Sequence, residues 1–334
     1  MKVLVVVLNY RGWEDTIVCL ESLENQKYSN FDVYLIENNS GDESAEKLEP
    51  LVKDNPKIIF DKQLTNTGFT GGVKICIKYA IDNKYDYVAL FNNDARADKD
   101  WLNNLLKSAK KTGASATTGL LLSGDGKTID DAGDAYTMWG VPELVAENKP
   151  AHEAPESGYV FGATGGATLY RTSLFKEIGL FDEKFFAYNE DVDISWRAQL
   201  AGHKFYYESS AIAYHKHSAT SSKIPGFTTT QVFQNLPLVY WKNVPLRLLW
   251  PIGWRFFLAY CMFIFWKTTQ GAFLPAVKGI WRSWKLFPHA LRERRSIQKS
   301  RVVEMSYIKS IIWPNLPIKS FNRIRKFFGI KYQK

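Results

Sequence analysis

Several short stretches of this 334-residue sequence concentrate acidic and amide side chains that could bind a charged ligand or accept a proton. The densest is FDEKFFAYNEDVDISWR at 181–197, which holds Glu190, Asp191 and Asp193 within four residues. Asp193 and Arg197 are spaced i, i+4 and can form a salt bridge on one helix face. Asp191 does not share that face, and a carboxylate beside aromatic side chains can have a raised pKa and act as a general base. A solvated acid at a helix N-terminus is the alternative interpretation of Asp191.

A second cluster, Asn92-Asn93-Asp94, directly follows an apolar run and could bind a metal ion. One or two carboxylates, completed by the phosphates of a substrate, are a common ligand set for Mg²⁺. Such a cation would neutralise the negative charge that grows on a diphosphate leaving group. Either His215 or His217 could add an imidazole ligand beside Asp94, although a His pair without a third ligand more often has no such role.

A glycine-rich stretch, NTGFTGG at 66–72, opens a predicted helix. Glycines at this place let backbone amides approach phosphate or sugar oxygens. The stretch lacks both the GxGxxG spacing of dinucleotide sites and the GK[ST] of phosphate-binding loops, which argues against a dehydrogenase or an NTPase. A tight turn without a ligand is the alternative interpretation.

The elements that must position these residues follow from hydrophobic periodicity in the first 120 residues. Apolar runs predict strands at 3–8, 33–36, 58–60 and 87–91, and helical spacing predicts helices at 14–26, 45–52 and 73–81. This alternation indicates an α/β fold with right-handed βαβ units, that is, a doubly wound, mostly parallel sheet with helices on both faces. Residues 123–160, rich in Gly, Asp and Pro, predict an irregular insertion, and regular structure returns at 161–215.

Polar residues follow each of the four predicted strands. They are Asn9, Tyr10, Glu37, Asn38, Asn39, Ser40, Asn66, Gly68, Asn92, Asn93 and Asp94. In open α/β sheets, ligands bind beyond the carboxyl ends of the strands. Any one of these clusters could be only a turn, but four of them at strand ends favour a single binding edge.

The two parts of the chain differ sharply in charge. Residues 1–222 carry 23 Lys and Arg against 32 Asp and Glu, whereas residues 223–334 carry 20 against 2. The second part also holds seven of the eleven tryptophans, and this combination favours an anionic membrane surface over nucleic acid as its partner. We therefore predict a catalytic domain at 1–222 and a basic, aromatic helical module at 223–334 that associates with a membrane or forms oligomers.

The stretch 248–266 is mostly apolar but is interrupted by Pro251 and Arg255. A spanning helix needs about 20 apolar residues, and a central charge disfavours it. We expect in-plane or re-entrant membrane association; a true span and a packed soluble subdomain or oligomer interface are the alternatives.

The three cysteines, Cys19, Cys76 and Cys261, are isolated and form no CxxC pair. They indicate neither a disulfide framework nor a zinc–thiolate site, and they fit a reducing compartment. The apolar run 3–8 is too short for a signal sequence. The expected location is the cytoplasm, peripherally at the inner face of the cell membrane.

Seven motifs in order resemble glycosyltransferase family 2, an inverting family with the GT-A fold, and most of all its rhamnosyltransferase-like members that build bacterial surface polysaccharides. The motifs are VVVLNY, IENNSGD, NTGFTGG, LFNND, GATGGATLYR, GLFDEKFFAYNEDVDISWR and AYHKHSATS, and they cover about residues 3–220. Two positions depart from the usual family pattern. Glu37 stands where Asp is commoner, and Asn92 replaces the first acid of the DxD motif, so fewer charges would face a metal.

The resemblance implies a role for each matched residue. The donor would be contacted by Asn9, Tyr10, Glu37, Asn66, Gly68, Asn92 and Asn93, the first three at the base and ribose. Asp94 and His215 would hold Mg²⁺ or Mn²⁺, and Asp191 would be the catalytic base. Gly165, Gly166 and Glu190 would lie on the acceptor side.

The expected activity is transfer of a sugar, with rhamnose as one candidate, from a nucleotide-diphosphate donor to a hydroxyl of a glycan or lipid-linked acceptor. Asp191 would take the proton from the attacking hydroxyl, and one in-line displacement would invert the anomeric centre. The alternatives are a nucleotidyltransferase, which shares the sheet and the metal acid, and a non-enzymatic membrane-docked scaffold.

Overall fold

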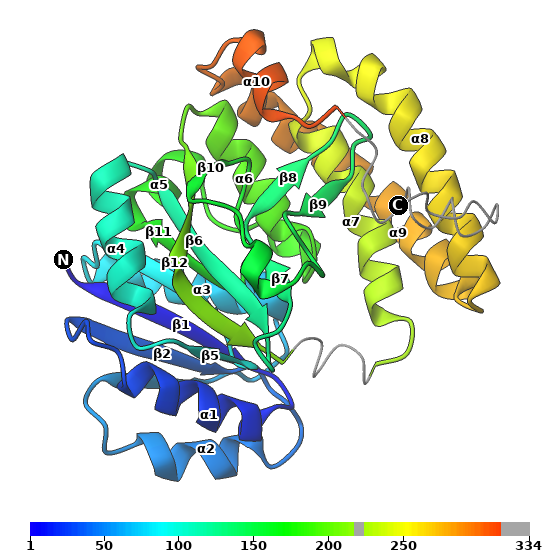
Figure 1. The fold of residues 1–334 in the computed structure, drawn as a ribbon. Coiled ribbons are helices and arrows are strands. Elements are labelled where there is room, and N and C mark those ends of the chain that lie inside the picture. Colours follow the sequence, from blue (N-terminus) through cyan, green and yellow to red (C-terminus); the bar gives the residue numbers. More distant parts are fainter. Residues whose placement is uncertain (217–223, 315–334) are drawn as a thin grey trace.

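A central mixed sheet carries helices on both faces, and a group of C-terminal helices lies beside it (Figure 1). The computed structural model describes residues 1–216 and 224–314. Within these residues the sheet has ten strands, in the order β10-β12-β6-β11-β4-β1-β2-β3, with β5 on β12 and β7 on β6. The predicted α/β fold with an added helical region is confirmed.

The first half follows the predicted alternation closely. Its elements are β1 (Val3–Asn9), α1 (Trp13–Glu24), β2 (Phe31–Glu37), α2 (Ser44–Val52), β3 (Ile58–Lys62), α3 (Gly68–Asp82) and β4 (Tyr87–Asn92). β1 pairs in parallel with both β2 and β4. Its odd residues, such as Val5, face a core built with α1, α2 and α4, and its even residues, such as Leu4, face a core built with α3, α5 and α6. Burial on both faces explains why β1 is a continuous apolar run.

The second half completes the sheet through one reversed strand. Its elements are β5 (Ala95–Ala97), α4 (Trp101–Thr112), β6 (Ala116–Ser123), β7 (Ile129–Asp131), β8 (Asp134–Tyr136), β9 (Pro142–Leu144), η1 (Ala151–Glu153), β10 (Gly158–Val160), β11 (Ala167–Arg171), α5 (Thr172–Ile178), η2 (Glu183–Phe185), α6 (Glu190–Leu200) and β12 (Phe205–His215). β11 runs antiparallel between β4 and β6, and β12 is again parallel to β6. The segment 123–160, expected to be irregular, contains four strands of three residues each.

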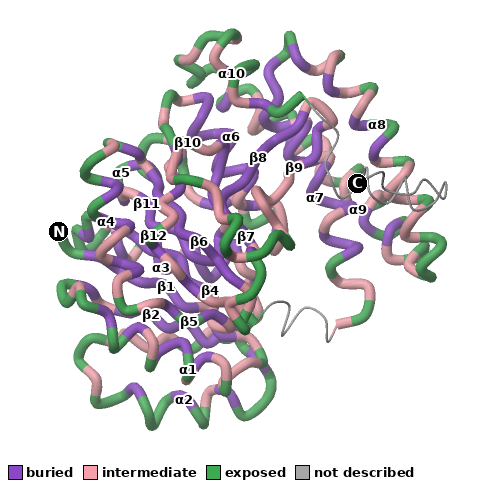
Figure 2. The backbone as a smooth tube through the Cα atoms, in the orientation of Figure 1, coloured by how far each residue is buried: buried purple, intermediate pink, exposed green. Residues whose placement is uncertain are grey.

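The C-terminal helices are α7 (Phe227–Asn243), α8 (Leu246–Thr269), α9 (Phe273–Lys299) and α10 (Met305–Ile311). One buried cluster joins Phe185 and Trp196 of the first part to Leu236, Val239 and Ile252 of α7 and α8. Figure 2 shows the result: buried residues run from the sheet into α7, whereas α8 has exposed positions along its length. α7 therefore packs on α6 as part of a shared core, and the division near residue 222 stays a prediction from composition.

Candidate active site

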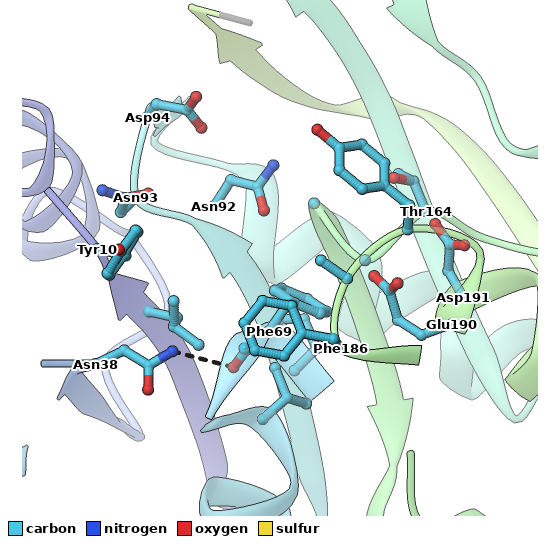
Figure 3. A pocket seen from close by; sticks show the side chains of 18 of the residues that line it. Tyr10, Asn38, Phe69, Asn92, Asn93, Asp94, Thr164, Phe186, Glu190 and Asp191 are labelled. Carbon is cyan, nitrogen blue, oxygen red and sulfur yellow. Dashed lines mark hydrogen bonds between the residues drawn. The ribbon is translucent and has the colours of Figure 1, made fainter. Parts of the chain in front are cut away.

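The carboxyl ends of β1, β2, β4 and β12 meet at one edge of the sheet, where a cavity of about 500 Å³ opens. The predicted site residues that line it are Tyr10, Asn66, Gly68, Asn92, Asn93, Asp94, Gly165, Gly166, Glu190, Asp191 and His215. Figure 3 shows Tyr10, Asn93 and Asp94 on one side of this cavity and Glu190 and Asp191 on the opposite side. His217, the alternative metal ligand, lies outside the described residues.

Two predicted donor contacts, Asn9 and Glu37, do not line this cavity. Asn9 is fully buried, and its Oδ1 accepts a hydrogen bond from Thr16 Oγ1 at 2.9 Å. Glu37 accepts hydrogen bonds from the backbone amides of Asn39, at 3.1 Å, and Ser40, at 2.9 Å. In this structure both side chains therefore support the loops that follow β1 and β2, and their contact with a donor stays a prediction.

Asn38, one of the polar residues expected at the strand ends, lines the cavity and shapes the glycine-rich turn. Its Nδ2 donates to Asn66 Oδ1 at 3.2 Å and to the Gly68 carbonyl at 3.0 Å, and its Oδ1 accepts from the Thr67 amide at 3.1 Å. Gly68 has φ +70°, and a Cβ there would stand 2.6 Å from the carbonyl oxygen of Phe186. Only glycine fits this turn, because its conformation is left-handed and a neighbouring loop approaches closely.

Asp94 and His215, the two expected metal ligands, lie in contact, and Asp130 contacts the same imidazole; metal binding by these residues stays a prediction. His215 Nε2 lies 3.0 Å from Asp94 Oδ1 and 3.3 Å from Asn92 Nδ2, and Nδ1 lies 2.6 Å from Asp130 Oδ2. Burial disfavours the charged imidazolium, but the two carboxylates outweigh this and raise the pKa of His215 to about 9. Sequence reasoning missed Asp130, which belongs to β7 in the insertion; the only signal was the acidic pair 130–131.

These residues fit a cation that is completed by its substrate. Among the described residues, no group of three or more His, Cys, Asp or Glu side chains has the spacing of an all-protein metal cage. Asp94 and His215 offer a carboxylate and an imidazole, and Asp130 can orient the imidazole as carboxylates commonly do beside metal-bound histidines. Mg²⁺ is usually held in this way, by one or two protein ligands together with substrate phosphates.

Two acids at the start of α6 are the candidate proton acceptors. Asp191 is partly exposed, and it accepts hydrogen bonds from the backbone amides of Val192, at 2.8 Å, and Gly165. Burial nevertheless raises its pKa above the ordinary value. Glu190 is 7% exposed, and its Oε2 has no hydrogen-bond partner among the residues that the structure describes. Burial, together with the nearby Asp191, raises the pKa of Glu190 well above the ordinary value. A carboxyl group with a raised pKa at a cavity wall is suited to accept a proton.

The predicted pairing of Asp193 with Arg197 is confirmed, with Nε 3.0 Å from Oδ2. Both side chains are buried, and Asp193 also accepts from Lys242 of α7 at 3.0 Å. Burial opposes ionisation of Asp193, but Lys242 and Arg197 lower its pKa below the ordinary value. Asp193 is therefore a charged structural residue, whereas Asp191, two positions earlier, faces the cavity.

Comparison with known proteins places this arrangement in a family. Residues 3–179 match the family described as glycosyl transferase family 2. The low-salt glycan biosynthesis hexosyltransferase Agl10 of Haloferax volcanii is 22% identical over 58% of this chain and 61% of its own length. The poly-beta-1,6-N-acetyl-D-glucosamine synthase of Staphylococcus aureus is 26% identical over 60% of this chain and 46% of its own length. The chain thus spans only about half to three fifths of these relatives.

A solved structure shares the fold over nearly the whole chain. The mannosyltransferase PcManGT from Pyrobaculum calidifontis, in complex with GDP-Man and Mn²⁺, covers 99% of this chain and 88% of its own, with a TM-score of 0.56 and 11% identity. This likeness supports the architecture alone, including the C-terminal helices. The family match, which covers more than half of the sequence, confirms the predicted family and enzyme class: the chain belongs to glycosyl transferase family 2.

Proposed function

We propose that this chain is an inverting, divalent-metal-dependent glycosyltransferase that moves a sugar from a nucleotide-diphosphate donor to a hydroxyl of a glycan or lipid-linked acceptor. One observation carries the proposal: Asp94 and Asp191 line the same cavity from opposite sides (Figure 3). An in-line displacement needs the departing diphosphate and the base on opposite sides of the anomeric carbon, and this separation supplies it.

Different side chains of the cavity would accept the proton, bind the cation and shape the donor side. Asp191 takes the proton from the acceptor hydroxyl as its oxygen attacks the anomeric carbon, and the bond to the diphosphate breaks in the same displacement. A divalent cation bound at Asp94 and His215 would neutralise the charge on the departing diphosphate. Asn38 and Asn66 hold the glycine-rich turn that lines the donor side.

The side chains of the cavity and one structure with the same fold support a divalent cation and a nucleotide-diphosphate sugar as ligands. The cavity offers a carboxylate and an imidazole at one end, which suits Mg²⁺ or Mn²⁺ together with phosphate oxygens. The mannosyltransferase that shares the fold was solved with GDP-Man and Mn²⁺. We therefore propose a nucleotide-diphosphate sugar as donor, and Mg²⁺ or Mn²⁺ as cofactor.

The relatives favour a hexosyl donor and glycan synthesis. One is named a hexosyltransferase of glycan biosynthesis and the other a synthase of an N-acetylglucosamine polymer. Rhamnose, expected from the sequence motifs, stays a candidate sugar beside these hexoses. Synthesis of a surface polysaccharide is the role that these names support best.

We further propose that α8 and α9 attach the protein to the anionic inner face of the cell membrane. Among the described residues, α8 is the one helix long and apolar enough to cross a membrane, and 22% of its most apolar stretch is buried in the protein. The apolar α8–α9 face comprises Leu246, Trp250, Phe257, Leu274, Trp281 and Trp284, all more than half exposed. So many large apolar side chains exposed on two helices suit an interaction surface better than open solvent.

Cations beside these aromatic residues favour a lipid headgroup region as the partner. Arg255 lies 4.3 Å from the Trp254 ring, and Lys285 lies 5.2 Å from the Trp281 ring. Tryptophan and basic side chains together suit the headgroup region. Because Arg255 lies in the middle of α8, attachment within the plane of the membrane is favoured over a span. An interface between copies of the chain is the alternative occupant of the same face.

The direct test uses purified protein with UDP-, dTDP- and GDP-sugars and Mn²⁺. We expect one nucleotide class to raise the melting temperature and its sugar to be transferred or slowly hydrolysed, with inversion of the anomeric configuration detected by NMR. Asp191→Asn should reduce turnover by about 10²–10⁴ while donor binding persists. If no member of the panel binds or reacts, or if Asp191→Asn reacts as fast as the wild type, the proposal is wrong.

A further inference from the structure

The loop that precedes the candidate base has an unusual backbone. Phe186, Tyr188 and Asn189 have φ values of 61°, 70° and 64°, so three of four consecutive residues are left-handed without being glycine. L-residues rarely adopt this conformation, and it persists only where surrounding contacts enforce it. Such backbone outliers gather at functional sites. We call residues 186–189 the base loop, because Asn189 directly precedes α6 and Asp191 lies in its first turn.

The base loop forms one wall of the cavity. All four of its residues line the cavity, together with Glu190 and Asp191. The carbonyl oxygen of Phe186 accepts from the Thr70 amide at 3.1 Å, and its ring packs against Gly68. The loop therefore connects the glycine-rich turn on the donor side with the acid on the other side, and a change in its path would move Asp191.

Buried amide side chains of α7 also hold this backbone. Asn235 is fully buried, and its Nδ2 lies 2.9 Å from the Phe185 carbonyl oxygen, 2.9 Å from that of Ala187 and 2.7 Å from that of Tyr188. Gln231, one turn earlier, donates to the same Phe185 carbonyl at 3.0 Å. Converging carbonyl oxygens repel one another, so a buried amide donor among them is needed to hold them together.

The orientation of the Asn235 amide is itself determined by its neighbours. Gln234 Nε2 donates to Asn235 Oδ1 at 3.0 Å and to the Lys184 carbonyl at 3.1 Å. Gln231, Gln234 and Asn235 lie on one face of α7, at the i, i+3, i+4 spacing. The three side chains are buried, and none of them lines the cavity.

We propose that Asn235 is a positioning residue that holds the base loop, and through it Asp191, in the geometry for proton abstraction. The inference rests on the proposed role of Asp191 as base. It makes α7 part of the catalytic unit, although its composition assigns it to the C-terminal module. The partner of Asn235 is the backbone of the loop, so its amide donors, rather than its volume, are what the reaction needs.

The test replaces these donors without changing the shape of the side chain. Asn235→Asp puts a carboxylate oxygen opposite the three carbonyl oxygens. We expect kcat to fall at least tenfold for the best donor of the nucleotide-sugar panel, with water or a sugar alcohol as acceptor. The affinity for the corresponding nucleoside diphosphate with Mn²⁺ should change less than threefold. Amide hydrogen exchange within 185–189 should become at least tenfold faster.

Two further variants show whether the loss of kcat depends on the hydrogen bonds to the base loop. Tyr240→Phe removes another buried hydrogen bond of α7, the 2.7 Å bond to the Leu249 carbonyl, and should change neither kcat nor exchange in the base loop. If Asn235→Asp does not fold, Gln231→Met serves as the second variant, because it removes one donor to the Phe185 carbonyl. It should lower kcat by a smaller factor and again leave the nucleotide affinity nearly unchanged.

The outcomes separate this inference from the proposed function. Wild-type kcat and wild-type exchange in Asn235→Asp, with Asp191→Asn inactive, would overturn the positioning role alone. Lost nucleotide affinity with unchanged kcat would also overturn it, because the loop would then serve donor binding. Equal turnover of Asp191→Asn and the wild type would instead overturn the role of Asp191, on which the inference rests.

Discussion

His215 Nε2 lies 3.0 Å from Asp94 Oδ1, although the two residues are 121 positions apart in the sequence. The contact forms because β5, which follows Asp94, pairs antiparallel with the end of β12. Asp130 holds the other ring nitrogen, so the imidazole is fixed between two carboxylates. A cation at this position would meet a ligand pair that is already oriented.

Replacing Asp94 tests this site. We expect Asp94→Ala to abolish transfer and to weaken binding of the nucleoside diphosphate in Mn²⁺, because one imidazole cannot hold the cation alone. Isothermal titration with and without Mn²⁺ measures the effect, and EDTA should have the same consequence in the wild type. Asp125→Asn, at an exposed turn, is the control and should behave as the wild type. Full activity in EDTA would contradict the metal site.

The pH dependence follows from the raised pKa of Asp191. A general base must be deprotonated, so activity should rise with pH through a midpoint clearly above 3.8, the ordinary value for an aspartate. The measurement is kcat/KM against pH at two concentrations of Mn²⁺. If Asp191 causes the rise of kcat/KM with pH, the midpoint of this rise should not change with the Mn²⁺ concentration. If protons and Mn²⁺ instead compete for His215, the midpoint should move to lower pH as Mn²⁺ increases. A midpoint that shifts with Mn²⁺ as such competition requires would contradict the assignment to Asp191.

The buried ammonium of Lys242 should contribute strongly to stability. Its Nζ lies 2.6 Å from Asp182 Oδ2 and 3.0 Å from Asp193 Oδ1, and the side chain is 2% exposed. Lys242→Met removes one cationic partner from buried Asp193, which keeps Arg197, and from partly buried Asp182. Losing one partner of a buried ionic network should lower the free energy of unfolding by about 3–5 kcal/mol. Lys62→Met, in an exposed pair with Glu49, should change it by less than about 1 kcal/mol. Urea unfolding measures both.

The ion pair of Lys242 with Asp182 also predicts that the free energy of unfolding depends on pH. Burial would raise the pKa of Asp182, but Lys242 and His289 hold it well below its ordinary value. In the unfolded chain the pKa of an aspartate is about 3.9. Above this pH the lowered pKa of Asp182 adds to the free energy of unfolding, and this contribution is lost as the pH falls towards the pKa of the folded state. The difference between wild type and Lys242→Met should narrow below pH of about 4. A constant difference would show that the pair is not the cause.

Membrane attachment can be tested on the apolar α8–α9 face in the full-length protein. We expect the wild type to sediment with liposomes that contain anionic lipid, and high salt to reduce this without eliminating it, because apolar contacts are insensitive to salt. Replacing Trp250, Trp281 and Trp284 with Gln should release the protein at high salt. Leu64→Ser, at another highly exposed apolar position, should sediment like the wild type. Wild-type protein that stays in the supernatant at low salt would favour an interface between copies of the chain.

The sequence alone was sufficient to predict the first half of the sheet and most of the cavity. β1, β2 and β4 are buried strands and β3 is a partly buried edge strand, and the apolar run of each is visible locally. The polar residues after them fall at one edge because parallel strands share their carboxyl ends. Tyr10, Asn66, Asn92 and Asp94 therefore reach the cavity as predicted. The pairing of Asp193 with Arg197 was equally accessible, because i, i+4 spacing on a helix is a local property.

Only the tertiary structure decided which distant groups complete the site. Asp130 reaches His215 because β7 pairs with β6, and Asn235 reaches the base loop because α7 packs against η2 and α6. Glu37 and Asn9 look like ligands at strand ends, yet the Glu37 carboxylate accepts from the loop after β2 and Asn9 Oδ1 accepts from Thr16 of α1. Local periodicity reports which face of an element is buried. It does not report which other element covers that face, because that choice depends on contacts between residues far apart in the chain.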